Sequence, residues 1–133
     1  MPKFPTAVTV TEIDAAVVGR SNGVVIDLAS DTGQSLVTPI VGPTATLTLR
    51  LLLNEFVGRS ECHLADLGAL LGMPHRAATF ERGLGRLVRF RFATAAGNHL
   101  GVVRHAAFSP TELGRMHPLL ADRYLAAAQA AAA

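Results

Sequence analysis

The chain has 133 residues, which suits one domain with a buried core. Half of the residues are hydrophobic, yet no stretch approaches the roughly 18 uninterrupted apolar residues of a membrane helix, so we expect neither a membrane protein nor a disordered one. The net charge of +2 is too small to identify a partner, and the single cysteine excludes an internal disulfide network and permits a reducing cytoplasm.

The first residues contain Pro2 and Pro5 and no apolar leader, so we expect residues 1–10 to form a mobile arm without a secretory signal. Residues 8–18 leave two possibilities open. Thr11 can cap a helical turn with Asp14 at its third position, or the segment can be extended.

Two stretches rich in β-branched residues come next. Residues 23–29 and 35–41 are typical of strands, and residues 30–34 between them are typical of a turn. We therefore predict an N-terminal β-hairpin. It contains no candidate catalytic or binding residue, and we expect it to pack on the core or to form a dimer contact.

A helix is predicted to begin at Thr44, after the break that Gly42 and Pro43 make, and to end at Gly58. Its apolar stripe consists of Leu47, Leu51, Leu52 and Phe56. Residues 61–63 can add a short strand to a later sheet.

The next pattern predicts two helices joined by a tight turn. Leu64, Leu67, Leu70 and Leu71 recur at three- and four-residue spacing, which places them on one side of a short helix. Gly72 follows where a left-handed C-cap residue is expected. Pro74 cannot continue that helix, but it can open the next one.

The second helix is predicted to run from His75 or Arg76 to Val88. At about 100° per residue its apolar and polar residues separate onto opposite faces. The apolar face consists of Ala77, Phe80, Leu84, Leu87 and Val88, and the opposite face of His75, Thr79, Arg82, Arg86 and Arg89. Gly83 and Gly85 each weaken the helix by about 1 kcal/mol relative to alanine. They indicate either close approach of a neighbouring backbone or an early helix end near Leu84.

A second hairpin follows this helix. Residues 89–93 alternate with period two, as in a half-buried strand. Residues 94–99 are typical of a turn in which Gly97 and Asn98 can take positive φ. Residues 100–105 return as the partner strand, which completes a predicted β-hairpin.

This order of parts resembles the winged helix-turn-helix DNA-binding domains of actinobacterial regulators and mobile-element proteins. The matching residues are Leu64-Ala-Asp-Leu, Leu71-Gly-Met, Phe80, Leu84, Arg86-Leu-Val-Arg-Phe and the hairpin that follows. The resemblance covers residues 44–108. It implies a three-helix core whose last helix enters the DNA major groove and a hairpin wing that touches the DNA backbone or minor groove.

The last part of the chain is predicted to be helical. Ser109, Pro110 and Glu112 are typical N-cap, N1 and N3 residues, and Pro118 can restart the helix, which we expect to fray at its closing alanines. We therefore predict an α+β protein with an N-terminal arm and hairpin over 1–43, a winged helix-turn-helix over 44–108 and a C-terminal helix over 109–133.

Positive charge is concentrated in the middle of the chain. Residues 1–58 hold three basic and five acidic side chains (−2), residues 59–108 hold seven arginines and three acids (+4), and residues 109–133 balance. The surplus coincides with the predicted DNA-reading unit.

Two groups of residues are candidates for DNA contact. Arginine can bond guanine O6 and N7, and threonine can meet a thymine methyl group. The base-reading candidates are His75, Arg76, Thr79, Arg82 and Arg86. The wing candidates, for phosphate or minor-groove contact, are Arg91, Asn98, His99 and Arg104. An ordinary solvated arginine face has the same pattern.

Catalytic and metal sites are not expected. The five histidines match no zinc spacing, the acidic residues form no pair placed for acid–base work, and Cys62 has no evident activating partner. Gly83-Leu-Gly85 lacks the lysine of a phosphate-binding loop. We expect a non-enzyme without a cofactor.

The sequence thus predicts a cytoplasmic, nucleoid-associated bacterial regulator of transcription that binds double-stranded DNA as a homodimer. The bias toward alanine, arginine and glycine suggests a GC-rich bacterial genome. Two alternatives stay open: a winged helix that binds another protein, and a DNA-binding accessory protein of a mobile element. Nothing in the sequence identifies an effector or an operator.

Overall fold

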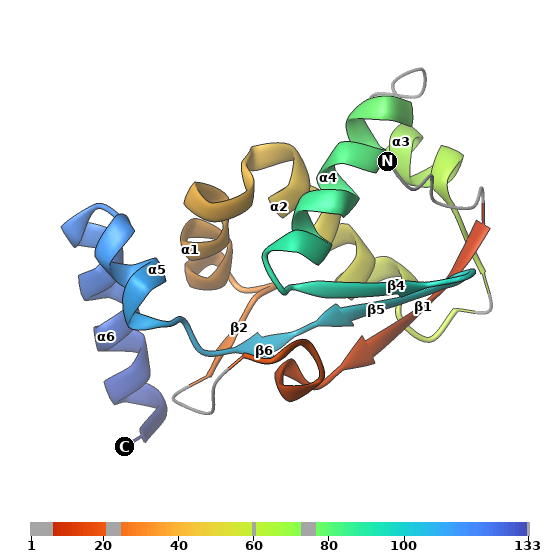
Figure 1. Ribbon diagram of the computed structural model, residues 1–133. Helices are drawn as coiled ribbons and strands as arrows, with labels where there is room; N and C mark the ends of the chain where they lie inside the picture. The colour runs from red at the N-terminus through yellow and green to blue at the C-terminus, as the bar shows by residue number, and fades with distance from the viewer. Residues whose placement is uncertain (1–6, 21–24, 60, 73–76, 133) are drawn as a thin grey trace.

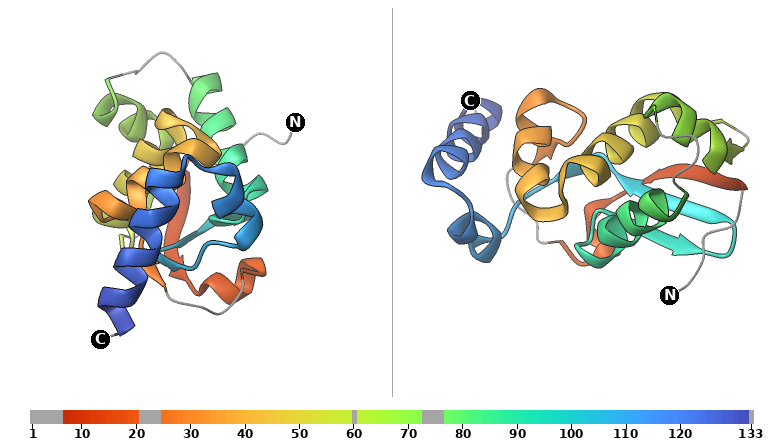
Figure 2. Two further views of the ribbon diagram at one scale, coloured as in Figure 1. Left: turned by 90° about the vertical axis from the view of Figure 1, so that its left-hand side faces the viewer. Right: turned by 90° about the horizontal axis from the view of Figure 1, so that it is seen from above.

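The computed structural model describes residues 7–20, 25–59, 61–72 and 77–132, and it shows an α+β protein (Figure 1). Helices α1 to α4 lie on one side of a mixed sheet, and α5 and α6 stand at one end of the molecule. Figure 2 shows α3 at the opposite end. Among the described residues, no helix is long and apolar enough to cross a membrane.

The N-terminal strand lies inside the sheet. The strand order is β3 (Cys62–His63), β1 (Ala7–Ile13), β5 (His99–Val103), β4 (Ala93–Ala96). β1 pairs antiparallel with β3, where Val8 faces Cys62, and parallel with β5, where Val10 faces Leu100. The short strands β2 (Ile26–Asp27) and β6 (His105–Ala106) form a separate antiparallel pair.

The expected mobile arm is therefore wrong for residues 7–10, while residues 1–6 lie outside the described residues. Of the two possibilities for residues 8–18, the extended one holds as far as Ile13. A short 3-10 helix, η1 (Ala15–Val18), follows. Its cap is Asp14 rather than Thr11, because the Asp14 carboxylate accepts a hydrogen bond of 2.9 Å from the amide of Ala16.

The predicted N-terminal hairpin is also wrong, because its second half is helix α1 (Asp31–Val41). Ser30 caps this helix by accepting a hydrogen bond of 3.0 Å from the amide of Gly33. The residues buried along α1 are Gly33, Leu36, Val37 and Val41. This helical spacing outweighs the strand propensity of the β-branched residues and the presence of Pro39.

The helix predicted after Gly42 is confirmed. It comprises α2 (Pro43–Leu51) and a π-helical turn, η2 (Leu52–Phe56). The short strand expected over residues 61–63 is also present, as β3, although its partner is β1.

The two helices of the central pattern are present as α3 (Leu64–Leu70) and α4 (Ala77–Arg89). Gly72 takes the left-handed conformation expected after α3, with φ 72°. Residues 73–76 lie outside the described residues. α4 continues to Arg89, so an early end near Leu84 is wrong.

The second hairpin exists, but it begins later than predicted. Residues 90–92 form the turn that ends α4, and Arg91 takes a left-handed φ of 67°. The amide of Phe92 bonds the carbonyl of Leu87 at 2.8 Å, as in a Schellman motif. Strand β4 starts only at Ala93, and Gly97 and Asn98 connect it to β5. The strand predicted over 89–93 is therefore wrong, since the alternation belongs to a helix end.

The C-terminal helix start is confirmed. α5 (Pro110–Arg115) carries a complete capping box between Ser109 and Glu112, and α6 (Pro118–Ala132) restarts at the second proline. α6 is helical as far as Ala132, and the expected fraying of its closing alanines stays a prediction. The amide of Phe108 donates a hydrogen bond of 3.3 Å to the Tyr124 hydroxyl, which ties α6 to the segment after β6.

One hydrophobic core joins the N-terminal segment, the sheet and the helices. Its largest fully buried side chains include Leu28, Leu36, Leu49, Leu52, Leu67, Leu84, Leu87, Phe92 and Leu100. The N-terminal third therefore contributes to the same core as the central helices and does not form a separate extension.

Candidate nucleic-acid interface

Helix α4 separates apolar and basic side chains onto opposite faces. Phe80, Leu84 and Leu87 are buried, at 3%, 0% and 0% exposure. The basic residues of the opposite face, Arg82, Arg86 and Arg89, are exposed. The position of α4 is thus set by its apolar face, and its arginines are left on the protein surface. Arg86 and Arg89 lie in the last turn, where positive charge complements the helix dipole.

A hollow separates this basic face from the start of α2. It has a volume of about 280 Å³ and is lined by residues 41–45 and by Thr79, Arg82, Gly83 and Arg86 of α4. We call it the α2–α4 hollow. Arg86 donates a hydrogen bond of 3.1 Å from Nη1 to the carbonyl of Val41, which holds the guanidinium at the junction of α1 and α2. Three of the sequence-predicted site residues, Thr79, Arg82 and Arg86, therefore meet in one place.

Two candidates lie at the tip of the hairpin. Asn98 and His99 are both exposed, and both contact β1. The Asn98 carbonyl accepts a hydrogen bond of 2.8 Å from the amide of Thr9. The His99 ring lies 2.9 Å from the hydroxyl of Thr11, measured from Nε2 to Oγ1. The tip is therefore supported by the N-terminal strand, and its side chains stay accessible.

The two remaining wing arginines make contacts within the protein. Arg91 is exposed, and its Nη1 lies 3.4 Å from the carbonyl of Gly19. Arg104 pairs with Glu12 of β1, lies 3.8 Å from an Asp27 carboxylate oxygen and donates a hydrogen bond of 2.8 Å to the carbonyl of Leu53. Because two carboxylates already face the Arg104 guanidinium, we leave it out of the proposed contact surface. His75 and Arg76 lie outside the described residues.

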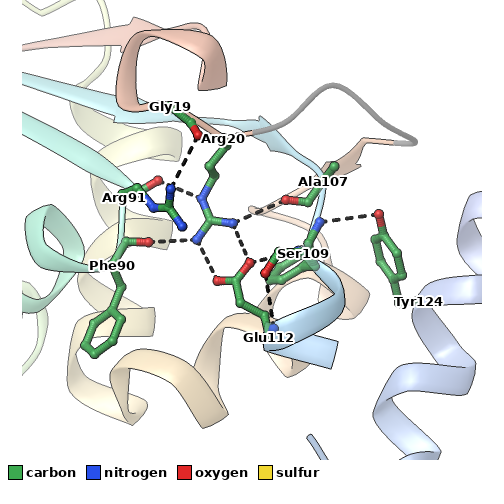
Figure 3. A network of polar contacts seen from close by, with 9 residues as sticks. Gly19, Arg20, Phe90, Arg91, Ala107, Ser109, Glu112 and Tyr124 are labelled. Carbon is green, nitrogen blue, oxygen red and sulfur yellow. Dashed lines mark hydrogen bonds and ion pairs between the residues drawn. The ribbon is translucent and has the colours of Figure 1, made fainter. Parts of the chain in front are cut away.

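Arg20 makes five side-chain hydrogen bonds, and the sequence did not indicate it as a site residue. Arg20 is 6% exposed and lies between the end of α4 and the start of α5 (Figure 3). Its Nε donates to the carbonyl of Arg91 and its Nη2 to that of Phe90, both at 2.7 Å. Its Nη1 donates to the carbonyl of Ala107 at 3.2 Å, and both terminal nitrogens bond the Glu112 carboxylate at 2.9 Å. The guanidinium also stacks 4.0 Å above the Phe92 ring.

The environment of Glu112 changes its pKa. Burial by itself raises the pKa of this carboxyl, but the hydrogen bonds from Arg20 and from the Ser109 amide, together with the Arg20 charge, outweigh burial and hold it below the ordinary value. Glu112 is therefore ionised at neutral pH. The Arg20–Glu112 pair holds the turn that ends α4, because Arg20 also bonds the carbonyls of Phe90 and Arg91.

Neither a reactive thiol nor a metal site emerges among the described residues. Burial, and to a lesser extent the nearby Asp66 charge, raises the pKa of the Cys62 thiol to about 11, so the thiol is protonated at neutral pH. No group of three or more His, Cys, Asp or Glu side chains lies within reach of one ion in the part of the chain that the structure describes.

Two features of the site had only a partial signal in the sequence. The capping-box pattern indicated Glu112 as a helix residue, but nothing paired it with Arg20, which stands in a glycine- and serine-containing segment typical of a loop. Gly42 and Pro43 were read only as a break between elements. Their place beside the arginines of α4 depends on the packing of α2 against α4.

Comparison of the chain with protein-family models, with curated proteins and with solved structures returned no match.

Proposed function

We propose that the protein binds double-stranded DNA through the exposed face of α4, and that residues 44–108 act as a winged helix-turn-helix. The order α2, β3, α3, α4, β4, β5 supports this, since it places a short helix, a turn and a basic helix before a hairpin. One feature differs from a simple wing, in which the hairpin strands pair only with each other. Here β1 lies between β3 and β5.

The observation that carries the proposal is the exposure of Arg82, Arg86 and Arg89 along one helix whose other face is buried. Arginines sorted in this way can reach phosphates and base edges of a duplex. Asn98 and His99, exposed at the hairpin tip, are the proposed wing contacts. In this proposal the protein is a cytoplasmic bacterial regulator of transcription.

The test compares two variants that lose the same charge. In the first, Thr79, Arg82 and Arg86 are changed to alanine; in the second, the exposed Arg59 and Arg115 are changed to alanine. Binding to a mixed-sequence duplex is followed by fluorescence anisotropy between about 50 and 200 mM salt. We expect the first variant to bind at least about tenfold more weakly and to reduce the slope of log affinity against log salt by about 2.

The second variant should retain the affinity and the salt slope of the wild type, since Arg59 and Arg115 are exposed and lie outside α4 and the hairpin. Equal binding by both variants would exclude α4 as the DNA-contacting element. Binding that does not change with salt, or an absence of binding by the wild type, would favour a protein partner over DNA.

The proposal includes a homodimer that forms through α6. Leu119 and Leu125 are 55% and 54% exposed on this helix, and Asp122 and Arg123 lie between them. Leu119 and Leu125 lie about 120° apart around α6, both away from the buried Tyr124, and two antiparallel copies of α6 can bury them against each other. Sedimentation equilibrium should give a dimer for the wild type and a monomer for Leu125→Glu. A monomeric wild type would remove this part of the proposal.

A further inference from the structure

The α2–α4 hollow is positively charged on the side that α4 provides. Arg82 and Arg86 both line it, and none of the described residues that line it carries a carboxylate. With a volume of about 280 Å³ it has room for roughly nine water molecules at liquid density, and thus for a tetrahedral anion with part of its hydration shell.

Gly42 leaves room for the guanidinium group of Arg86. A Cβ atom at Gly42 would lie 3.1 Å from Arg86 Nη1, and Gly42 has a φ of 90°, which disfavours any other residue there. The hydrogen bond to the Val41 carbonyl occupies one of the five N–H donors of Arg86. The residue is thus anchored at the edge of the hollow with further donors able to reach a ligand.

The start of α2 forms the opposite side of the hollow. Gly42 is its N-cap and offers no side-chain acceptor, and Pro43 at N1 has no N–H. The amides of Thr44 and Ala45 belong to the first turn, in which backbone N–H groups have no partner within the helix. These amides and the positive end of the helix dipole add to the charge of the two guanidinium groups.

We propose that the α2–α4 hollow is a binding site for a phosphate group, held by the guanidinium groups of Arg82 and Arg86 and by the amides of Thr44 and Ala45. The two arginines, opposite the helix end and without a carboxylate among the described lining residues, select an oxyanion over a neutral ligand. If the protein binds DNA as proposed above, the ligand is a backbone phosphate. Arg82 and Arg86 then position the duplex through its phosphate backbone.

The first experiment is an NMR titration of the full chain with inorganic phosphate, against sodium chloride at matched ionic strength. We expect saturable shifts of the Thr44 and Ala45 amides and of the Arg86 Nε–H signal with phosphate only. Arg86→Gln should weaken phosphate binding at least about tenfold. The matched change Arg115→Gln, at an exposed arginine of α5 outside the hollow, should leave it unaltered. If these amides show no saturable shift in the wild type, the proposal is overturned.

A second arm distinguishes the two sources of phosphate. If the ligand is a backbone phosphate, duplex DNA should displace inorganic phosphate from the hollow. Arg86→Gln should then weaken binding to every duplex equally and lower the salt slope by about 1. Phosphate binding without any binding of DNA would support the site, assign it to a free phosphate ester and refute the proposed function. If the protein binds DNA but its hollow does not bind phosphate, the phosphate site is refuted and the proposed function is supported.

Discussion

At the scale of single residues, Arg20 has the most complete set of contacts in the described chain. A guanidinium has five N–H donors, and each of the five hydrogen bonds of Arg20 takes one of them. The acceptors come from the turn after α4, from the segment before α5 and from Glu112 of α5. One side chain therefore joins the N-terminal part of the chain to two segments about 70 and about 90 residues away.

Replacing Arg20 by methionine should be strongly destabilising. The change leaves the half-buried Glu112 carboxylate and three carbonyl groups without their donor, and breaking a buried pair from one side costs about 3–5 kcal/mol. Arg20→Lys keeps the positive charge but loses the planar guanidinium group. It should therefore lower the free energy of unfolding by an intermediate amount. Urea denaturation measures both. The control is Arg59→Met, at an exposed arginine; an Arg20→Met variant as stable as this control would contradict the assigned role.

The lowered pKa of Glu112 predicts a dependence of stability on pH. Because the folded pKa lies below the unfolded value near 4.5, the pair stabilises the fold fully above that value and loses its effect as the pH falls through the folded pKa. Urea denaturation of the wild type at a series of pH values should show the free energy of unfolding decreasing in this acidic range. Glu112→Gln should be less stable at neutral pH and should show a shallower decrease. If the free energy of unfolding decreased equally with falling pH in both proteins, Glu112 would not be the cause of the acid sensitivity.

At the scale of elements, two helix glycines should respond oppositely to alanine. A Cβ atom at Gly85 of α4 has nothing within 4 Å, so Gly85→Ala should stabilise the protein by about 1 kcal/mol through helix propensity. A Cβ atom at Gly33 of α1 would lie 2.2 Å from the Asp27 carbonyl oxygen, so Gly33→Ala should destabilise by about 1–3 kcal/mol. Urea midpoints measure both changes, and shifts of the same sign would contradict the packing of α1 on β2.

Elements with local signals were predicted well. α3 and its glycine cap, the apolar face of α4 and the capping box of α5 each depend on residues within one or two helical turns. α1 was missed because valine, isoleucine and proline favour a strand locally, while the burial of Leu36, Val37 and Val41 at helical spacing is a tertiary effect.

Features that depend on distant partners could not be predicted. β1 lies between β3 and β5, so its partners are more than 50 and 85 residues away in the chain. The contacts of Arg20 with Glu112 and the approach of Gly42 to Arg86 are equally non-local. The arginines of α4 were identified from the sequence, but their meeting with the start of α2 was not.

At the scale of the whole molecule, the division into an extension and a self-contained winged helix conflicts with the sheet. β1 supplies the strand between β3 and β5, and α1 packs against α2, α4 and α6. Among the described residues before residue 44, seven apolar side chains are buried: Val8, Val10, Ile26, Leu28, Leu36, Val37 and Val41. The core of the protein is therefore shared between its N-terminal third and the region that resembles a DNA-binding domain.

The fragment 44–108 should consequently fail to fold on its own. Burial of an aliphatic side chain contributes about 1.5–3 kcal/mol, so the loss of seven removes roughly 10–20 kcal/mol, whereas a small domain has a net stability of about 5–15 kcal/mol. The fragment also loses Arg20 and leaves β3 and β5 unpaired where β1 lay. We expect a collapsed amide spectrum by NMR and no cooperative thermal transition. The longer fragment 43–133 should also fail alone, and a peptide of residues 1–42 added to it should restore both signals, because the cut falls between α1 and α2. A dispersed spectrum from 44–108 alone would instead make the N-terminal third dispensable for the fold.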